Sequence, residues 1–361
     1  MMGGLIRAVG AAVYDYPAVP QDVVGHGEFG RLKVALVADS YTAHCMAIEC
    51  RVRVMTPRNY REIIEDWRPD LVFVESAFHG ADGSWRYGLA KQPLWLRLGP
   101  PAAILALVAR ARDRGVPTVF WNKDDGAFFE DFIEVARAFD YIFTTDQDRV
   151  ADYRRHVAAQ VPVHTLTMPY QPAFHQFSGF HFERHEACFT GSYYRRILGE
   201  RRRFLDMVFD ACASVRLPLN VYDRNRDRLS RHFEFAFPRH PQLRVHDKVP
   251  YRLTADIYKQ HVISVNVNSV TGSATMVSRR LLEILACGGI AVTNPSLAVE
   301  RQFRDYCHVV TSAAETRELF ARLRRGPSTQ DLARAEAGAA YVRQHHTWAH
   351  RLRDVCGIVK C

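Results

Sequence analysis

The feature of this sequence that most constrains its fold is a regular alternation of short apolar runs with helix-like segments. Residues 32–39 (LKVALVAD) and 51–57 (RVRVMTP) are typical of β-strands, and residues 59–67 (NYREIIEDW) of a helix. The next run, 70–76 (DLVFVES), is apolar on both faces, as in a central strand of a parallel sheet covered on two sides. The alternation continues with helices expected at 101–114 and 128–138 and strands at 116–121, 141–145 and 163–168.

The alternation restarts in the second half of the chain after a segment without periodicity. That segment, 169–187, is rich in Pro, aromatic and His residues and is expected to connect two domains. Beyond it we expect strands at 187–192, 219–223, 262–268, 289–294 and 308–312, an edge segment at 244–251, and helices up to 214 and at 253–260, 278–287, 313–325 and 329–345. A chain of 361 residues is long enough for two domains. The sequence therefore predicts an α/β protein of two doubly wound, Rossmann-like domains that face a central cleft, with functional loops at the carboxyl ends of the strands.

Composition narrows the class of protein. No stretch approaches the roughly 18–20 apolar residues that span a bilayer, and the N-terminus lacks a signal-peptide pattern, so we expect a cytoplasmic protein. The eight cysteines form no CxxC pair, which predicts reduced, mostly buried thiols. A net charge of +9 favours phosphates, nucleic acid or an anionic membrane face as partners. The sequence has no Walker motif and no Gly-x-Ser-x-Gly, so ATPase and serine hydrolase classes lack their main support.

The most informative segment is 266–294 (NVNSVTGSATMVSRRLLEILACGGIAVTN). A strand ends there in a small polar loop, which passes through Arg280 into a helix with Glu283 and leaves through Ala-Cys-Gly-Gly at 286–289. This segment resembles the donor site of group 1 glycosyltransferases. It is closer to their CgeB-like, spore-maturation-type branch, in which an Arg three residues before a Glu precedes Ala-Cys-Gly. The tail YVRQHHTWAHRL (341–352) resembles the end of the same family, and 120–132 and 139–146 match it more weakly.

The resemblance implies a GT-B fold and a retaining, metal-independent transfer of a sugar from a nucleoside-diphosphate sugar, most simply a UDP-sugar, to a hydroxyl acceptor. Together, the sequence pattern and the resemblance predict five parts of the chain: a flexible leader at 1–30, an N-terminal acceptor-binding domain at 31–170, a linker at 171–186, a C-terminal nucleotide-sugar-binding domain at 187–335, and a C-terminal helix at 336–361 that packs back towards the N-terminal domain. The family context points to surface or envelope glycans. The expected partners are the nucleotide-sugar donor, a glycan, lipid-linked or small-molecule acceptor, and an anionic membrane at the inner face; no cofactor is expected.

Physical chemistry supports a donor site in this segment. A helix N-terminus presents free N–H groups, so the loop 271–278 can hold a diphosphate. Arg280 can neutralise the departing phosphate, and Glu283 can accept both hydroxyls of a ribose, unless it only pairs with a nearby arginine. The segment 189–196 (FTGSYYRR) is a second phosphate-facing element, and Tyr251 either stacks on the base or closes the edge of the core. The predicted donor contacts are Gly191, Ser192, Arg195, Arg196, Tyr222, Lys248, Val249, Tyr251, Asn268, Gly272, Ser273, Thr275, Arg280 and Glu283.

In the first half, SAFHG (76–80) and WNKDDG (121–126) follow strands, where acceptor and catalytic groups are expected. The predicted catalytic residues are His79, Asp124 and Arg280, and the predicted acceptor contacts are Ser40, Trp85, Trp121 and Asp125. His79 can instead be a loop histidine that caps backbone groups. Asp124 and Asp125 are contiguous and do not form the Asp-x-Asp of a metal-dependent transferase, so no metal ligand is assigned.

Two other functions remain open on the sequence. A sugar-nucleotide epimerase of the same fold shares the donor half and converts a UDP-sugar without any acceptor. A basic nucleic-acid-binding protein uses its arginines on phosphates, but the chain lacks an aromatic-plus-basic recognition motif, so nucleic acid is not the expected partner.

Overall fold

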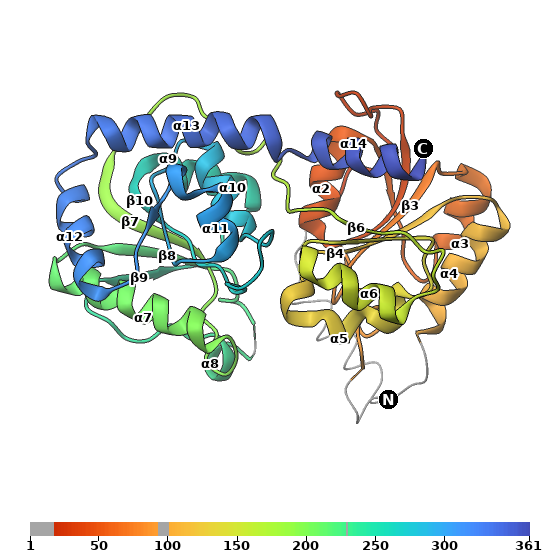
Figure 1. Ribbon diagram of the computed structural model, residues 1–361, viewed down its shortest axis with the longest axis horizontal. Helices are drawn as coiled ribbons and strands as arrows, with labels where there is room; N and C mark the ends of the chain where they lie inside the picture. The colour runs from red at the N-terminus through yellow and green to blue at the C-terminus, as the bar shows by residue number, and fades with distance from the viewer. Residues whose placement is uncertain (1–17, 93–100, 229) are drawn as a thin grey trace. The chain divides into compact units, whose positions relative to one another are not determined.

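The computed structural model describes residues 18–92, 101–228 and 230–361 (Figure 1). The chain divides into two compact units. Unit 1 combines the chain up to Met168 with Trp348–Cys361, and unit 2 is Pro169–Thr347. Each unit is built on its own parallel sheet of six strands. Two units with one sheet each agree with the α/β fold predicted from the double alternation.

The sheet of unit 1 has the strand order β2-β1-β3-β4-β5-β6, and all of its neighbouring strands are parallel. Its strands are β1 (Lys33–Val37), β2 (Arg51–Val54), β3 (Leu71–Glu75), β4 (Thr118–Asn122), β5 (Tyr141–Thr144) and β6 (Val163–Thr165). Strands β3 and β4 are buried along their whole length, as their apolar sequences require. The order reverses between β1 and β3, so the carboxyl ends of these two strands form the topological switch point, where doubly wound folds bind ligands.

Helices connect the strands of unit 1 and cover its sheet (Figure 1). They are α2 (Ser40–Glu49), α3 (Tyr60–Glu62) continued by a π-helix at Ile63–Trp67, α4 (Ala102–Asp113), α5 (Asp125–Ala136), α6 (Val150–His156) and the final helix α14 (Trp348–Val359). Helix α14 packs against α2. The indole of Trp348 meets that of Trp121 edge-on, with ring centroids 5.7 Å apart.

Part of the expected leader is tied to this sheet. The first 17 residues lie outside the described residues. Further on, Asp22 N donates to Val52 O (2.7 Å), Val54 N donates to Gln21 Oε1 (2.8 Å), and Arg51 Nε donates to Asp22 Oδ1 (2.9 Å). The expectation of a flexible leader is therefore wrong for this segment, because its polar groups pair with the edge strand β2.

The sheet of unit 2 has the strand order β12-β11-β10-β7-β8-β9, again with all neighbouring strands parallel. Its strands are β7 (Arg184–Gly191), β8 (Leu219–Asp223), β9 (Leu243–His246), β10 (His261–Val265), β11 (Ala291–Thr293) and β12 (His308–Val309). Its helices are α7 (Gly199–Ser214), α8 (Arg231–Glu234), α9 (Thr254–Gln260), α10 (Arg279–Ala286), α11 (Leu297–Gln302), α12 (Ala313–Leu323) and α13 (Thr329–His345). The order reverses between β7 and β10, which places the switch point of this sheet at their carboxyl ends.

The C-terminal segment is two helices rather than one. Helix α13 ends at His345 in unit 2, and α14 begins at Trp348 in unit 1. Between them, Tyr170 N donates to His346 O (2.9 Å), which pairs the two places where the chain passes from one unit to the other. Within the described part of the chain, no helix has the length and apolar character needed to cross a bilayer.

Candidate functional site

The switch point of unit 2 brings the end of β7 against the start of α10. Arg280, in the first turn of α10, donates from Nε to the carbonyl of Thr190 and lies over the Phe189 ring, 4.7 Å from its centroid. A Cβ atom at Gly191 would lie only 2.5 Å from Arg280 Nη2. A glycine is therefore needed at 191 so that the Arg280 guanidinium can lie against the backbone there. The sequence had suggested that this glycine admits a ligand to the backbone.

A second guanidinium, which sequence reasoning missed, lies beside the same ring. Arg201 of α7 is only 7% exposed and lies 6.0 Å from the Phe189 centroid. It donates to Val267 O (3.1 Å) and to Ser192 O (3.2 Å), so it joins the loops that follow β10 and β7. Burial, and then the charge of Arg280, lowers the pKa of Arg201 to about 9, which leaves it charged at neutral pH.

Within the described part of the chain these two cations have no directly paired carboxylate, although the charge of Glu283 acts on Arg280. In the described residues neither Arg201 nor Arg280 forms an ion pair with a carboxylate, and Arg201 Nε and Arg280 Nη1 are enclosed without a hydrogen-bond partner. The exposed Arg224, whose N–H bonds to Gly191 O (3.4 Å), adds positive charge next to both. Buried donors without partners cost stability unless a ligand satisfies them. This cluster of Arg201, Arg224 and Arg280 therefore has the electrostatics of a site for a multivalent anion.

Glu283 lies one helical turn beyond Arg280 and is 5% exposed. Its Oε1 accepts hydrogen bonds from the Tyr251 hydroxyl (2.9 Å) and from Arg279 Nε (3.0 Å). The ion pair that the sequence left open is therefore present, and it leaves Oε2 without a hydrogen bond from the described part of the chain. Tyr251 in turn contacts the buried His175, whose Nδ1 lies 3.1 Å from the hydroxyl. Tyr251 is thus held against Glu283 by its hydroxyl group.

The ionisation of Glu283 depends on its neighbours. Burial alone would raise the pKa of Glu283, but the charges of His175 and Arg279 and the Tyr251 hydrogen bond together hold it below its usual value. Burial also lowers the pKa of His175 to about 4, so this imidazole is neutral at pH 7. At neutral pH the charge of Arg279, followed by the Tyr251 hydrogen bond and the charge of Arg280, therefore keeps Glu283 ionised.

The loop before α10 is held by its own polar side chains. Ser273 Oγ accepts from the backbone of Thr275 (3.3 Å) and Met276 (3.2 Å), and Asn268 Oδ1 accepts from Ser278 N (2.8 Å). Asn268 and Ser273 are 2% and 3% exposed. Both predicted contacts thus shape the loop, while Gly272 is exposed within it.

The end of α10 explains the glycines of the motif. Gly288 has φ +72°, and a Cβ there would lie 2.4 Å from the ring of Phe177. A Cβ at Gly289 would lie 2.9 Å from Ile284 Cγ2. The glycines therefore end the helix and admit the connecting segment, which is a structural role.

The other predicted donor contacts form no hydrogen bond or ion pair with Arg280 or Glu283 in the described residues. Ser192 is buried, and its Oγ accepts from Asn225 Nδ2 (2.8 Å). Arg195 donates to His232 O (3.1 Å), and Tyr222 stacks on His246. Lys248 forms an ion pair with Asp227. Arg196 is exposed and Val249 is half-buried.

The switch point of unit 1 holds a buried ionic group. Lys123, directly after β4, contacts Asp39 Oδ2 and lies 2.7 Å from Glu75 Oε1 at the end of β3. Glu75 is fully buried and also accepts from Asp39 N (2.8 Å) and from the Thr42 hydroxyl. Burial, and then the charge of Asp39, raises the pKa of Glu75 to about 7 against the opposing effect of Lys123. Sequence reasoning missed this group, although its members directly follow or end three strands.

The structure buries some of the predicted acceptor and catalytic residues of unit 1 and leaves others partly exposed. The indoles of Trp85 and Trp121 are each 1% exposed and donate to Met55 O (2.8 Å) and Leu166 O (3.0 Å). Their assignment to the acceptor is wrong because both rings fill the core of unit 1. Asp125 is fully buried and Ser40 is 7% exposed, so neither presents a free surface group. His79 and Asp124 are half-buried, and Asp124 Oδ2 accepts from Ser76 Oγ (3.4 Å) beside Lys123.

Comparison with known proteins bears on the fold and on the class of protein. Residues 195–357 match a family model described as Glycosyl transferase-like. No curated protein matches the sequence closely enough to count as a relative. The chain has the fold of the GT-B glycosyltransferases. The predicted GT-B fold is therefore confirmed. The predicted enzyme class, glycosyltransferase, is confirmed by the family match over residues 195–357.

Three solved structures illustrate the fold. HepE of Anabaena, in complex with UDP and glucose, is 9% identical with a TM-score of 0.54, covering 91% of this chain and all of HepE. An α-glucosyltransferase in complex with UDP and a mismatched DNA is 9% identical with a TM-score of 0.58, covering 87% of this chain and 86% of its own. A UDP-forming trehalose-phosphate synthase from Burkholderia vietnamiensis is 11% identical with a TM-score of 0.51, covering 83% and 74%. At these identities the comparison supports the fold alone.

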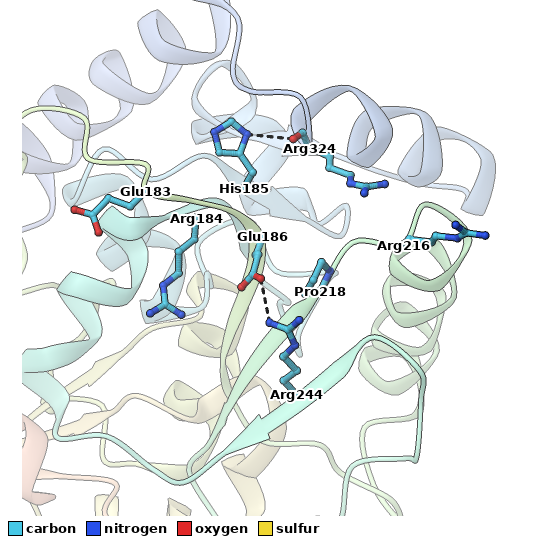
Figure 2. A pocket seen from close by; sticks show the side chains of 8 residues that line it. All are labelled: Glu183, Arg184, His185, Glu186, Arg216, Pro218, Arg244 and Arg324. Atoms are coloured by element: carbon cyan, nitrogen blue, oxygen red, sulfur yellow. Dashed lines mark hydrogen bonds and ion pairs between the residues drawn. The ribbon is translucent and has the colours of Figure 1, made fainter.

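The GT-B chain also has a cavity of about 520 Å³ at the opposite, amino-terminal edge of the unit 2 sheet (Figure 2). Its lining mixes charges, with Glu186 paired to Arg244 at 3.0 Å, and the arginine side chains point in different directions. It lies away from the carboxyl ends of the strands, where Arg280 lies against the end of β7. Among the residues that the structure describes, no group of three or more His, Cys, Asp or Glu side chains could hold a metal ion.

The stability of the protein is expected to depend on pH through the buried Asp125. Burial raises the pKa of Asp125 to about 7, well above its value in an unfolded chain. Between about pH 4 and pH 7 the folded state therefore keeps this proton while the unfolded state has lost it. The free energy of unfolding falls by roughly 1.4 kcal/mol per pH unit as the pH rises through that window. We expect Asp125→Asn, compared with the wild type by urea unfolding, to be relatively more stable at pH 8 than at pH 5. Asp148→Asn, which removes an exposed carboxylate of the same unit, is the control; the same pH trend in both variants would contradict the assignment.

Proposed function

We propose that unit 2 binds a nucleoside-diphosphate sugar and that the protein transfers this sugar to a hydroxyl group of an acceptor. The observation that carries the proposal is the pair of guanidinium groups, Arg201 and Arg280, at the carboxyl ends of β7 and β10. Each has a buried N–H group without a hydrogen-bond partner in the described residues, and Glu283 follows one turn along α10. A diphosphate supplies negative charge to these groups, and the ribose beside it supplies hydroxyl donors for a carboxylate.

The same arrangement assists departure of the nucleotide. Breaking the sugar–phosphate bond increases the negative charge on the diphosphate, and a fixed guanidinium stabilises that charge more in the transition state than in the bound donor. Arg280 is held by Thr190 O and by the Phe189 ring before any ligand arrives. It therefore needs little reorganisation during the reaction.

UDP is the donor nucleotide that we propose, because the structural neighbours named above are described with UDP or as UDP-forming. Metal independence, retention of anomeric configuration, membership of the CgeB-like branch and a role in envelope glycans belong to this proposal as implications of the sequence resemblance. The cytoplasm, and contact with an anionic inner membrane face, likewise remain predictions from composition.

Unit 1 is the proposed acceptor side. His79 and Asp124 are the predicted catalytic residues that stay partly accessible, and both follow strands that end at the switch-point edge. The acceptor hydroxyl has to come within hydrogen-bond reach of whichever group takes its proton. The buried Lys123–Glu75 pair fixes the loop from which Asp124 projects.

Binding of the nucleotide is tested by a thermal-shift series with UDP-, GDP-, TDP- and CMP-sugars, because a ligand of the folded state raises Tm. We expect the largest shift with a UDP-sugar. Glu283→Gln should lose most of that shift, since the neutral amide binds ribose hydroxyls less strongly than a carboxylate does. Glu300→Gln, which removes an exposed carboxylate on α11, is the matched control and should keep it. A shift unaffected by Glu283→Gln would place the nucleotide elsewhere.

Incubation of the best UDP-sugar alone separates the transferase from the epimerase. A transferase releases little UDP until an acceptor hydroxyl is added, while an epimerase changes the sugar without releasing UDP. Conversion of the sugar in the absence of acceptor would therefore replace our proposal with the second one.

A further inference from the structure

Two cysteines lie together at the end of helix α14 in unit 1, whereas the proposed donor residues belong to unit 2. Cys356 is half-buried and Cys361 is exposed, whereas the other six cysteines of the chain are buried. The two sulfur atoms are 2.9 Å apart.

The helix end explains this contact. Lys360 follows the last residue of α14 and has φ +65°, and its N–H donates to Cys356 O (2.8 Å). A left-handed residue at this position turns the chain back over the last helical turn and brings the next side chain onto the one that precedes it by five residues. The local backbone geometry at the helix end therefore brings Cys361 onto Cys356. This contact does not depend on the proposed binding of a nucleotide sugar.

The two thiols also differ chemically from the others. The hydrogen bond between the two thiols lowers the pKa of Cys361, which increases its fraction of reactive thiolate. By contrast, burial raises the pKa of Cys188 and of Cys307 to about 12. An accessible, more acidic thiol with a second thiol in contact is the arrangement of an oxidisable pair.

We propose that Cys356 and Cys361 are a site of reversible oxidation, at which the two thiols form an intrachain disulfide in the presence of a peroxide. In the first step the Cys361 thiolate attacks a peroxide oxygen, forming a sulfenic acid and releasing one water molecule after proton uptake. In the second step Cys356 attacks the sulfenic sulfur, forming the S–S bond and releasing a second water molecule. Two thiols lose two electrons in total, and one hydrogen peroxide gains them.

A third cysteine lies close to this pair. Cys50 directly follows helix α2, against which α14 packs, and it interacts electrostatically with both Cys356 and Cys361. However, Cys50 is fully buried, and its Sγ donates to Met46 O (3.2 Å). The proposal therefore assigns no redox role to Cys50.

The test uses the full chain, reduced and then freed of reductant. Treatment with one equivalent of hydrogen peroxide should remove two thiols per chain that react with a thiol reagent in the native protein, and dithiothreitol should restore both. After trypsin digestion, mass spectrometry should find the Cys356 peptide joined to Cys361, two hydrogen atoms lighter than the sum of its parts. Cys361→Ser should abolish this product.

Cys50→Ser is the matched control, because serine keeps the hydrogen bond to Met46 O, and it should form the same disulfide as the wild type. An unchanged native thiol count after peroxide would overturn the proposal. So would a disulfide that contains Cys50, a disulfide between two chains, or oxidation of Cys361 to a sulfinic acid without disulfide formation.

Discussion

Replacing Arg280 with alanine is expected to weaken UDP binding about 10- to 100-fold, which corresponds to roughly 1.5–3 kcal/mol for a lost charged hydrogen bond. The effect is large because Arg280 is enclosed, stacks on Phe189 and keeps Nη1 free of any partner in the described residues. The loss of sugar transfer should exceed the loss of binding, since charge on the leaving phosphate increases in the transition state. Isothermal titration with UDP and initial rates at saturating donor measure the two effects separately.

Stability of the free protein distinguishes a binding role for Arg280 from a structural one. Removing one of two neighbouring cations relieves their repulsion, which offsets the lost contacts with Thr190 and Phe189. We therefore expect the Tm of the free variant to change little. Arg304→Ala, which removes an exposed ion pair of α11, is the control and should leave UDP affinity unchanged. A large drop in Tm with normal affinity would show that Arg280 serves the fold.

Replacing Lys123 with methionine is expected to destabilise the protein by about 3–5 kcal/mol, because it leaves the buried Glu75 without its cation. Methionine keeps the apolar stem, so the lost charge causes most of the effect. The loss should be largest above pH 7, where Glu75 has to be ionised, and smaller at pH 5.5, where burial already favours its protonated form. Urea unfolding at the two pH values measures the loss in the free energy of unfolding and the direction in which that loss changes with pH.

The matched control for Lys123 is Arg137→Ala, which breaks an exposed pair with Glu134 in the same unit. Such a surface pair contributes at most about 1 kcal/mol. The double variant Lys123→Met, Glu75→Gln should regain part of the lost stability, because it removes the unpaired charge. Equal losses in the Lys123 variant and the control would contradict the buried-pair interpretation.

Much of the architecture was predictable from the sequence, because each half buries strands that are apolar on both faces. Strand β8 and helix α13 have the predicted bounds, 219–223 and 329–345. Helix α2 was not predicted, because it is buried on most sides and so lacks an apolar stripe. Its start is set by Asp39, whose side chain accepts from Thr42 N (2.8 Å).

The candidate site was predictable only where one local motif carries it. Arg280 and Glu283 are close in sequence, so their spacing on one helix could be used. Arg201 and Lys123 were missed because their partners, Val267 and Glu75, come from distant strands. The error over Trp85 and Trp121 has a related cause, since a tryptophan near a strand end fits the core as well as a ligand surface.

Helix α14 has a practical consequence for dissecting this protein. Unit 1 is discontinuous in sequence, because Trp348, which packs on Trp121, is supplied by the chain only after the whole of unit 2. A recombinant fragment that stops at Met168 would expose the indole of Trp121 and should aggregate, while unit 2 can be excised as a single piece. A cut near 347 would leave the two units covalently joined at 168, whereas a cut near 168 would leave only α14 of unit 1 attached to unit 2.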